Sequence, residues 1–201
     1  MKQVFKKYIG DKKFYKMVLL IAVPIMVQNG ITNFVSLLDN IMVGQVGTNQ
    51  MSGVAIANQL IFVYNLCIFC GMSGAGIFGA QFFGQGNNDG LRYVFRFKLV
   101  TGFVITAIVS VNFSMYGEPL ISLYLDESNS AVANAETLQY AMEYLQIMLV
   151  GFLPFVVVQI YASTLREVSE AILPMVAGIA AVLVNLVLNY TLILGNFGAP
   201  A

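Results

Sequence analysis

Asp39 is the carboxylate that lies well inside a predicted apolar span, in the stretch Leu37–Gly44. An ionisable group in hydrocarbon is costly and is usually kept for a function. Three, seven and eleven residues before Asp39 stand Ser36, Thr32 and Gln28, and a helix of 3.6 residues per turn places all four on one stripe. This stripe predicts a helix face turned towards a bundle interior or a wet cavity. In the alternative interpretation, Asp39 marks the outer end of a shorter helix and contacts headgroup water.

Two asparagines form a second polar group in an otherwise apolar run. Asn185 and Asn189 are four residues apart, so their amides share one helix face. If the spans alternate in direction, this pair and Asp39 lie at comparable depth in the outer half of the membrane, and Asn58 near the start of the second span can join them. Carboxylate and amide oxygens suit a proton or Na⁺, which is a hard cation like Ca²⁺ and Mg²⁺. Hydrogen bonds between helices, without any ion, are the alternative for the asparagines.

These residues give a predicted ion site and pathway. The predicted Na⁺ or H⁺ site consists of Asp39, Asn185 and Asn189, and the predicted ion or substrate pathway consists of Gln28, Thr32, Ser36 and Asn58. Neither a catalytic residue nor a cofactor other than this coupling ion is predicted.

The composition excludes several classes of function. Histidine is absent, which removes Ser-His-Asp triads, zinc sites built on His and haem ligation by His. Ten Lys and Arg balance ten Asp and Glu, so the formal net charge is zero and no basic field indicates nucleic acid. Apolar residues make up 58% of the 201 residues and charged residues only 10%, against about 25% charged in soluble domains. The chain is therefore predicted to be an integral membrane protein and not an enzyme.

Two short motifs resemble cofactor or redox signatures but lack the required context. Cys67 and Cys70 form a C-x-x-C inside an apolar stretch, without a second pair or a βαβ pattern, and are interpreted as small apolar side chains. The spacing of Gly74, Gly76 and Gly79 matches a dinucleotide fingerprint, but a long apolar run precedes it instead of a short strand. Close helix packing is the better interpretation, along two predicted rows of small residues. The rows are Gly71, Ala75 and Gly79, and Gly76, Ala80 and Gly84.

Five runs are long enough to cross the hydrocarbon, which takes about 20 helical residues. They are Met17–Val43, Val54–Phe78, Leu99–Met115, Leu138–Leu165 and Ile172–Leu194. With alternating spans, all ten basic residues fall on one side, which places the N-terminus in the cytoplasm. Pro24 is predicted to bend or loosen the first span, as membrane helices tolerate. The sequence thus predicts an all-α, multi-pass protein of the cytoplasmic (plasma) membrane.

Several motifs in order along the chain resemble one family of transporters. The run from Pro24 and Gln28 through Leu38-Asp39-Asn40-Ile41-Met42-Val43-Gly44 is similar to the first helix of multidrug and toxic compound extrusion (MATE) transporters. The resemblance continues through the glycine-rich stretch Gly71–Gly86. It extends to Tyr144-Leu145-Gln146-Ile147, Leu165-Arg166 and the run Asn185-Leu186-Val187-Leu188-Asn189-Tyr190.

The resemblance implies a fold and a function. MATE transporters have two lobes of six helices and export cationic or amphipathic compounds in exchange for Na⁺ or H⁺. The resemblance implies that Asp39 is the coupling-ion carboxylate and that Asn185 and Asn189 are its partners. It also implies that Pro24 marks the bend of the first helix. Some members carry an acid where this chain has Asn189, so proton schemes that need both acids do not transfer directly.

The length gives a further expectation. Residues 1–201 correspond to a partial N-terminal lobe of five helices, which predicts a fragment that lacks its sixth helix and its second lobe. Two alternatives to drug antiport remain. One is a lipid-linked saccharide flippase of the related superfamily, which would need Lys or Arg in its cavity to neutralise pyrophosphate. The other is an inert or regulatory membrane fragment that packs against a partner.

Overall fold

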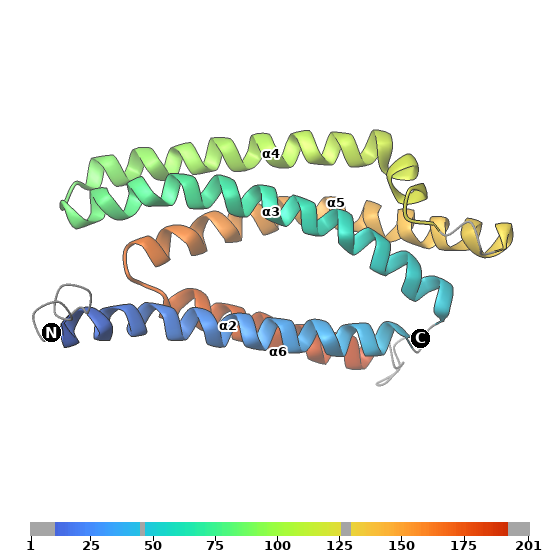
Figure 1. Ribbon diagram of the computed structural model, residues 1–201, viewed down its shortest axis with the longest axis horizontal. Coiled ribbons are helices and arrows are strands. Elements are labelled where there is room, and N and C mark those ends of the chain that lie inside the picture. The colour runs from blue at the N-terminus through green and yellow to red at the C-terminus, as the bar shows by residue number, and fades with distance from the viewer. Residues whose placement is uncertain (1–10, 45–46, 126–129, 193–201) are drawn as a thin grey trace, which may run out of the picture. The chain divides into compact units, whose positions relative to one another are not determined.

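The computed structural model describes residues 11–44, 47–125 and 130–192 as five long helices without a strand among them (Figure 1). The helices are α2 (Lys12–Gly44), α3 (Thr48–Gly84), α4 (Asn88–Ser122), α5 (Ala131–Glu167) and α6 (Ile172–Leu192). They form two compact units. One unit holds α2 up to Leu38 together with α6, and the other, Asp39–Val168, holds the end of α2 with α3, α4 and α5.

Each predicted span lies within one of these helices, as far as the described residues reach. All five helices are long and apolar enough to cross a membrane, which confirms the all-α membrane fold. Helices α2 to α5 run well beyond the predicted spans, to between 33 and 37 residues. A span predicted from hydropathy ends at the first charged residue. The helix itself can continue through charged residues until its terminal N–H and C=O groups find other hydrogen-bond partners. In α4, for example, the Asn87 side chain accepts a hydrogen bond from the Gly90 N–H at 2.9 Å.

The α3–α5 unit has a core built around Tyr64. Its ring stacks on Phe152 with a centroid distance of 4.0 Å and an interplanar angle of 17°. The buried Tyr64 hydroxyl lies 3.0 Å from Thr106 Oγ1 and 3.3 Å from the Phe152 carbonyl oxygen, to which it donates. The phenol thus satisfies its polar atom inside an apolar core, which holds α3, α4 and α5 together.

The first predicted row of small residues brings α3 close to its neighbours. Ala75 and Gly79 are buried, and a methyl group at Gly71 would lie 3.2 Å from Ile105 Cδ1 of α4. Within the described residues the second predicted row packs only at Gly76, because Ala80 and Gly84 are exposed and a methyl group at Gly84 would meet no atom within 4 Å. A small residue permits close approach but does not bring a partner to its face.

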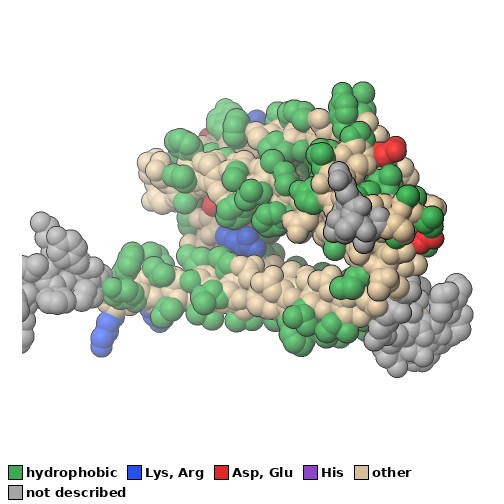
Figure 2. Space-filling view, turned by 45° about the vertical axis from the view of Figure 1, so that its right-hand side comes forward, with side chains coloured by type: hydrophobic (Ala, Val, Ile, Leu, Met, Phe, Trp, Pro, Cys, Tyr) green, Lys and Arg blue, Asp and Glu red, His purple; other side chains and the backbone are tan. Residues whose placement is uncertain are grey.

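The outer faces of the helices are apolar. Large hydrophobic side chains are exposed along every helix, and Figure 2 shows hydrophobic side chains spread over the visible surface. Val150 is 75% exposed, Ile147 72% and Met26 70%. Because such surface is unfavourable in water but not in acyl chains, these faces are suited to lipid.

The α2–α6 unit has a close approach between Gln28 and Gly178. A methyl group at Gly178 would lie 2.7 Å from Gln28 Nε2, so the flexible Gln28 side chain would have to move to admit it. Pro24 lies inside α2, and the helix continues on both sides of it. The bend at Pro24 therefore remains a prediction, while the continuity of the helix is established.

Candidate coupling-ion site

Asp39 lies in α2, five residues before the helix ends at Gly44, and is half-buried. It belongs to the unit formed by α3, α4 and α5. Its charge interacts electrostatically with the phenol of Tyr144 on α5. The Tyr144 hydroxyl in turn donates a hydrogen bond of 3.4 Å to Asn58 Oδ1 on α3. Tyr144 is therefore hydrogen-bonded to Asn58 on α3 and lies within electrostatic range of the Asp39 carboxylate on α2.

Tyr144 is a candidate functional residue that was not among the predicted site residues. It appeared only within a motif of the family resemblance. The available signal was chemical, since a tyrosine combines an apolar ring with a hydroxyl that can donate a hydrogen bond. Here that partner is Asn58, one of the predicted pathway residues.

The polar stripe of α2 has varied environments. Thr32 donates its hydroxyl to the Gln28 carbonyl at 3.0 Å, which is a local bond within the helix. The Gln28 side chain is half-buried beside Gly178 of α6, whereas Thr32 and Ser36 are exposed. All four residues of the stripe lie in one uninterrupted helix, as the 3.6-residue period requires.

Asn185 and Asn189 share one face of α6. The Asn189 Nδ2 donates to Asn185 Oδ1 at 3.2 Å, which confirms the prediction that the two amides share one helix face. Asn185 is exposed and Asn189 is half-buried. The pair belongs to the α2–α6 unit and Asp39 to the other unit, so their joint role in binding an ion remains a prediction.

Among the described residues, no three His, Cys, Asp or Glu side chains gather as ligands for a metal ion.

A second ionic group lies elsewhere in the α3–α5 unit. Lys98 of α4 is fully buried and pairs with Glu167 of α5, and its Nζ also donates to Ser163 Oγ at 3.0 Å. The Glu167 carboxylate lies against α3, where a methyl group at Gly76 would be 2.6 Å from its Oε1. Lys98 directly precedes the predicted span Leu99–Met115 and is one of the ten basic residues predicted to lie on the cytoplasmic side. The sequence signal for the burial of Lys98 was its position on one helix face with Val94, Gly102 and Thr106. These residues follow one another at intervals of four, and all are buried.

Five apolar helices with a half-buried carboxylate in the first define a multi-pass α-helical membrane protein with an ionisable group inside a span. A family model described as MatE matches residues 24–191. The chain therefore belongs to the MatE family, multidrug and toxic compound extrusion transporters, as its motifs indicated, and is a multi-pass protein of the plasma membrane.

Curated relatives carry names that refer to drug resistance. The chain is 25% identical over 204 residues to a protein of Thermotoga maritima named probable multidrug resistance protein NorM, covering 98% of this chain and 42% of the relative. It is 24% identical to a protein of the same name from Bacillus subtilis, over 92% of this chain and 40% of the relative. It is 25% identical to the multidrug resistance protein MdtK of Yersinia pestis, over 98% of this chain and 41% of the relative.

The chain thus spans about two fifths of the length of these relatives. No solved structure matches it significantly.

Proposed function

We propose that these five helices belong to a cation-coupled antiporter that exports cationic or amphipathic drugs in exchange for Na⁺ or H⁺. The observation that carries the proposal is the half-buried Asp39 in a MatE-family chain, within electrostatic range of Tyr144, whose hydroxyl is hydrogen-bonded to Asn58. Because the chain spans about two fifths of its relatives, transport is proposed for the full-length transporter, in which a second lobe completes the structure. Its role is transport rather than catalysis.

The proposed mechanism rests on the single charge of Asp39. One carboxylate in a low-dielectric environment is stable when one positive charge neutralises it. A coupling cation and a cationic drug would therefore exclude each other at, or close to, this group. Asn185 and Asn189 would supply amide oxygens to the coupling ion, while Gln28, Thr32, Ser36 and Asn58 would line its path. Pro24 would provide the bend between two states of α2.

Transport by Asp39→Asn tests this proposal. We expect ion-driven efflux of a fluorescent organic cation by the full-length transporter to fall about tenfold or more, since a hydrogen bond to a charged group is worth at least about 1.5 kcal/mol. Asp89→Asn is the matched control, because Asp89 is exposed and pairs only with the exposed Arg92 at 3.3 Å. This control should retain efflux. Separate gradients of Na⁺ and pH would identify the coupling ion. Undiminished, ion-driven efflux by Asp39→Asn would contradict the proposal.

Transport of a pyrophosphate-linked saccharide is less well supported. Such a substrate requires cationic side chains that are free to neutralise it. Lys98 is a cation within a span-forming helix, but it is already paired with Glu167 in the interior. The inert-fragment alternative is tested by reconstituting the 201-residue chain alone, since ion-coupled transport by that chain would rule it out.

A further inference from the structure

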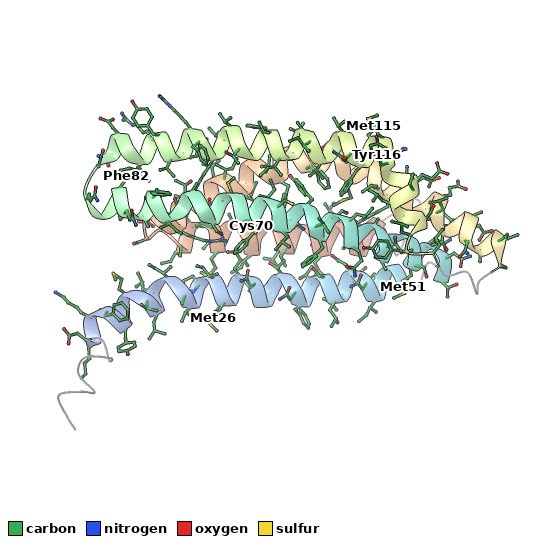
Figure 3. The ribbon with its side chains drawn as sticks, turned by 45° about the horizontal axis from the view of Figure 1, so that its top comes forward. Met26, Met51, Cys70, Phe82, Met115 and Tyr116 are labelled. Atoms are coloured by element: carbon green, nitrogen blue, oxygen red, sulfur yellow. The ribbon has the colours of Figure 1, made fainter. Side chains whose placement is uncertain are left out.

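An apolar groove of about 660 Å³ runs along the surface between α3 and α4. Most of its lining comes from one cysteine, one alanine and four aromatic rings, which are Cys70, Ala75, Phe78, Phe82, Tyr93 and Phe97. Figure 3 labels two of them, with Phe82 beside the α3–α4 turn and Cys70 farther along α3. This groove lies entirely within the α3–α5 unit and takes no part in the proposed ion site.

Glycine keeps the floor of the groove open. Gly74 lines it, and a methyl group built on Gly74 would meet no atom within 4 Å. The space above this residue is therefore unfilled by the protein. We expect a larger side chain at Gly74 to extend into the groove, because its first carbon would meet no neighbouring atom.

The length and position of the groove match one leaflet of a bilayer. Cys70 and Phe82 lie twelve positions apart along α3, which corresponds to about 18 Å at 1.5 Å per residue. This is slightly more than half of the roughly 30 Å hydrocarbon thickness. The groove ends near the α3–α4 turn, and the basic residues that follow this turn place it on the cytoplasmic side. Its dimensions thus suit an acyl chain of the cytoplasmic leaflet.

A cation without a carboxylate partner lies at the cytoplasmic end of the groove. The guanidinium of Arg96 stands 6.0 Å from the ring centroid of Tyr93, which lines the groove. Arg92 is paired with Asp89, and Lys98 is paired with Glu167. Among the described residues of α4, Arg96 therefore remains available for an external anion. At headgroup level that anion is a phosphate of a lipid.

We propose that the α3–α4 groove binds an anionic phospholipid of the cytoplasmic leaflet, with an acyl chain along Phe78 and Gly74 and the headgroup at Arg96. The apolar lining selects an acyl chain, and Arg96 selects a negative over a zwitterionic headgroup. This proposal is independent of the transported substrate and of the coupling ion.

The chain has no tryptophan, so a single introduced one reports on this site alone. Phe78→Trp, in the groove, is compared with Phe69→Trp, which is on the same helix, 65% exposed and outside the groove. Both variants are reconstituted in nanodiscs that contain phosphatidylglycerol or phosphatidylcholine with brominated acyl chains, at equal mole fraction. Quenching of the tryptophan by bromine measures the local concentration of each lipid.

We expect phosphatidylglycerol to be enriched about fivefold over phosphatidylcholine at the Phe78→Trp site, as one arginine contact with an anionic lipid implies. The Phe69→Trp site should show equal quenching by the two lipids. Adding Arg96→Gln should abolish the preference, whereas adding Arg92→Gln should keep it, because Arg92 is already paired with Asp89. Adding Gly74→Leu should reduce quenching of the groove tryptophan by both lipids.

Two results would overturn the proposal, provided that circular dichroism shows native helicity for the variants. Equal quenching by both lipids at Phe78→Trp would mean that the groove contacts bulk lipid without selecting its headgroup. Weak quenching by both lipids there, with normal quenching at Phe69→Trp, would mean that a protein segment or a second copy of the chain covers the groove.

Discussion

Lys98 of α4 and Glu167 of α5 form an ion pair inside the α3–α5 unit, although 69 residues separate them in the chain. Lys98 is fully buried, and the Glu167 side chain is 11% exposed. Ser163 accepts a second hydrogen bond from the ammonium group, while Glu167 Oε2 is buried without a hydrogen-bond partner. This pair joins α4 to the C-terminal end of α5, and the Glu167 carboxylate lies close to Gly76 and Gly79 of α3.

Breaking this pair from one side should be strongly destabilising. We expect Lys98→Met to lower the free energy of unfolding by about 3 to 5 kcal/mol, because Glu167 would stay buried without its counter-charge. The double variant Lys98→Met with Glu167→Met should recover most of this loss, since no charge remains to be desolvated. Unfolding by SDS in mixed micelles measures the free energy of unfolding of the single and the double variant. A double variant as unstable as the single one would show that the charge pair is not the cause.

Two glycines of α3 should respond oppositely to the same substitution. Gly79→Ala should cost about 1 to 3 kcal/mol, because the added methyl group meets the Glu167 carboxylate and lies 3.4 Å from Val94 Cγ1. Gly74→Ala should instead stabilise by up to about 1 kcal/mol, as its methyl group meets nothing and alanine favours a helix. The midpoint temperature of thermal unfolding in detergent is measured for both variants. Similar shifts of this temperature in the two variants would contradict the contact assigned to Gly79.

The hydroxyl of Tyr64 should contribute to the stability of the core. We expect Tyr64→Phe to lower the free energy of unfolding by about 1 kcal/mol, the usual worth of a hydrogen bond, because Thr106 and the Phe152 carbonyl lose a partner. Tyr116→Phe removes the same atom from an exposed position on α4 and serves as the control. Both are measured by the same unfolding titration, and equal effects would refute a specific role for the buried hydroxyl.

Tyr144 should matter for transport more than for folding. On the proposed function, Tyr144→Phe removes the hydroxyl that connects Asn58 with the neighbourhood of Asp39. Ion-driven efflux by the full-length transporter should then fall about two- to fivefold, in line with a hydrogen bond of up to about 1 kcal/mol. Tyr161→Phe, at an exposed position of the same helix, should leave efflux unchanged. A loss of thermal stability that accounts for the whole decrease would assign Tyr144 a structural role instead.

The helical membrane fold could be predicted because its cause is local. A run of about 20 apolar residues specifies a spanning helix by itself, since its backbone must be hydrogen-bonded internally in lipid. The spacing of Asn185 and Asn189 is equally local, and the structure confirms that they share a face. The order of the motifs identified the family, which the match over residues 24–191 establishes.

The environments of particular side chains depended on which helices pack together. Gly79 and Gly84 belong to similar rows in the sequence, but only Gly79 meets a neighbouring helix. The four-residue spacing with Val94 and Gly102 places Lys98 on one face of its helix, but its charge partner comes from α5 and is 69 positions away in the sequence. The sequence alone determined that these helices cross a membrane, because that depends on short-range hydropathy. Tertiary structure decided where their charges and cavities lie, because a buried ion is stable only beside a partner supplied by another helix.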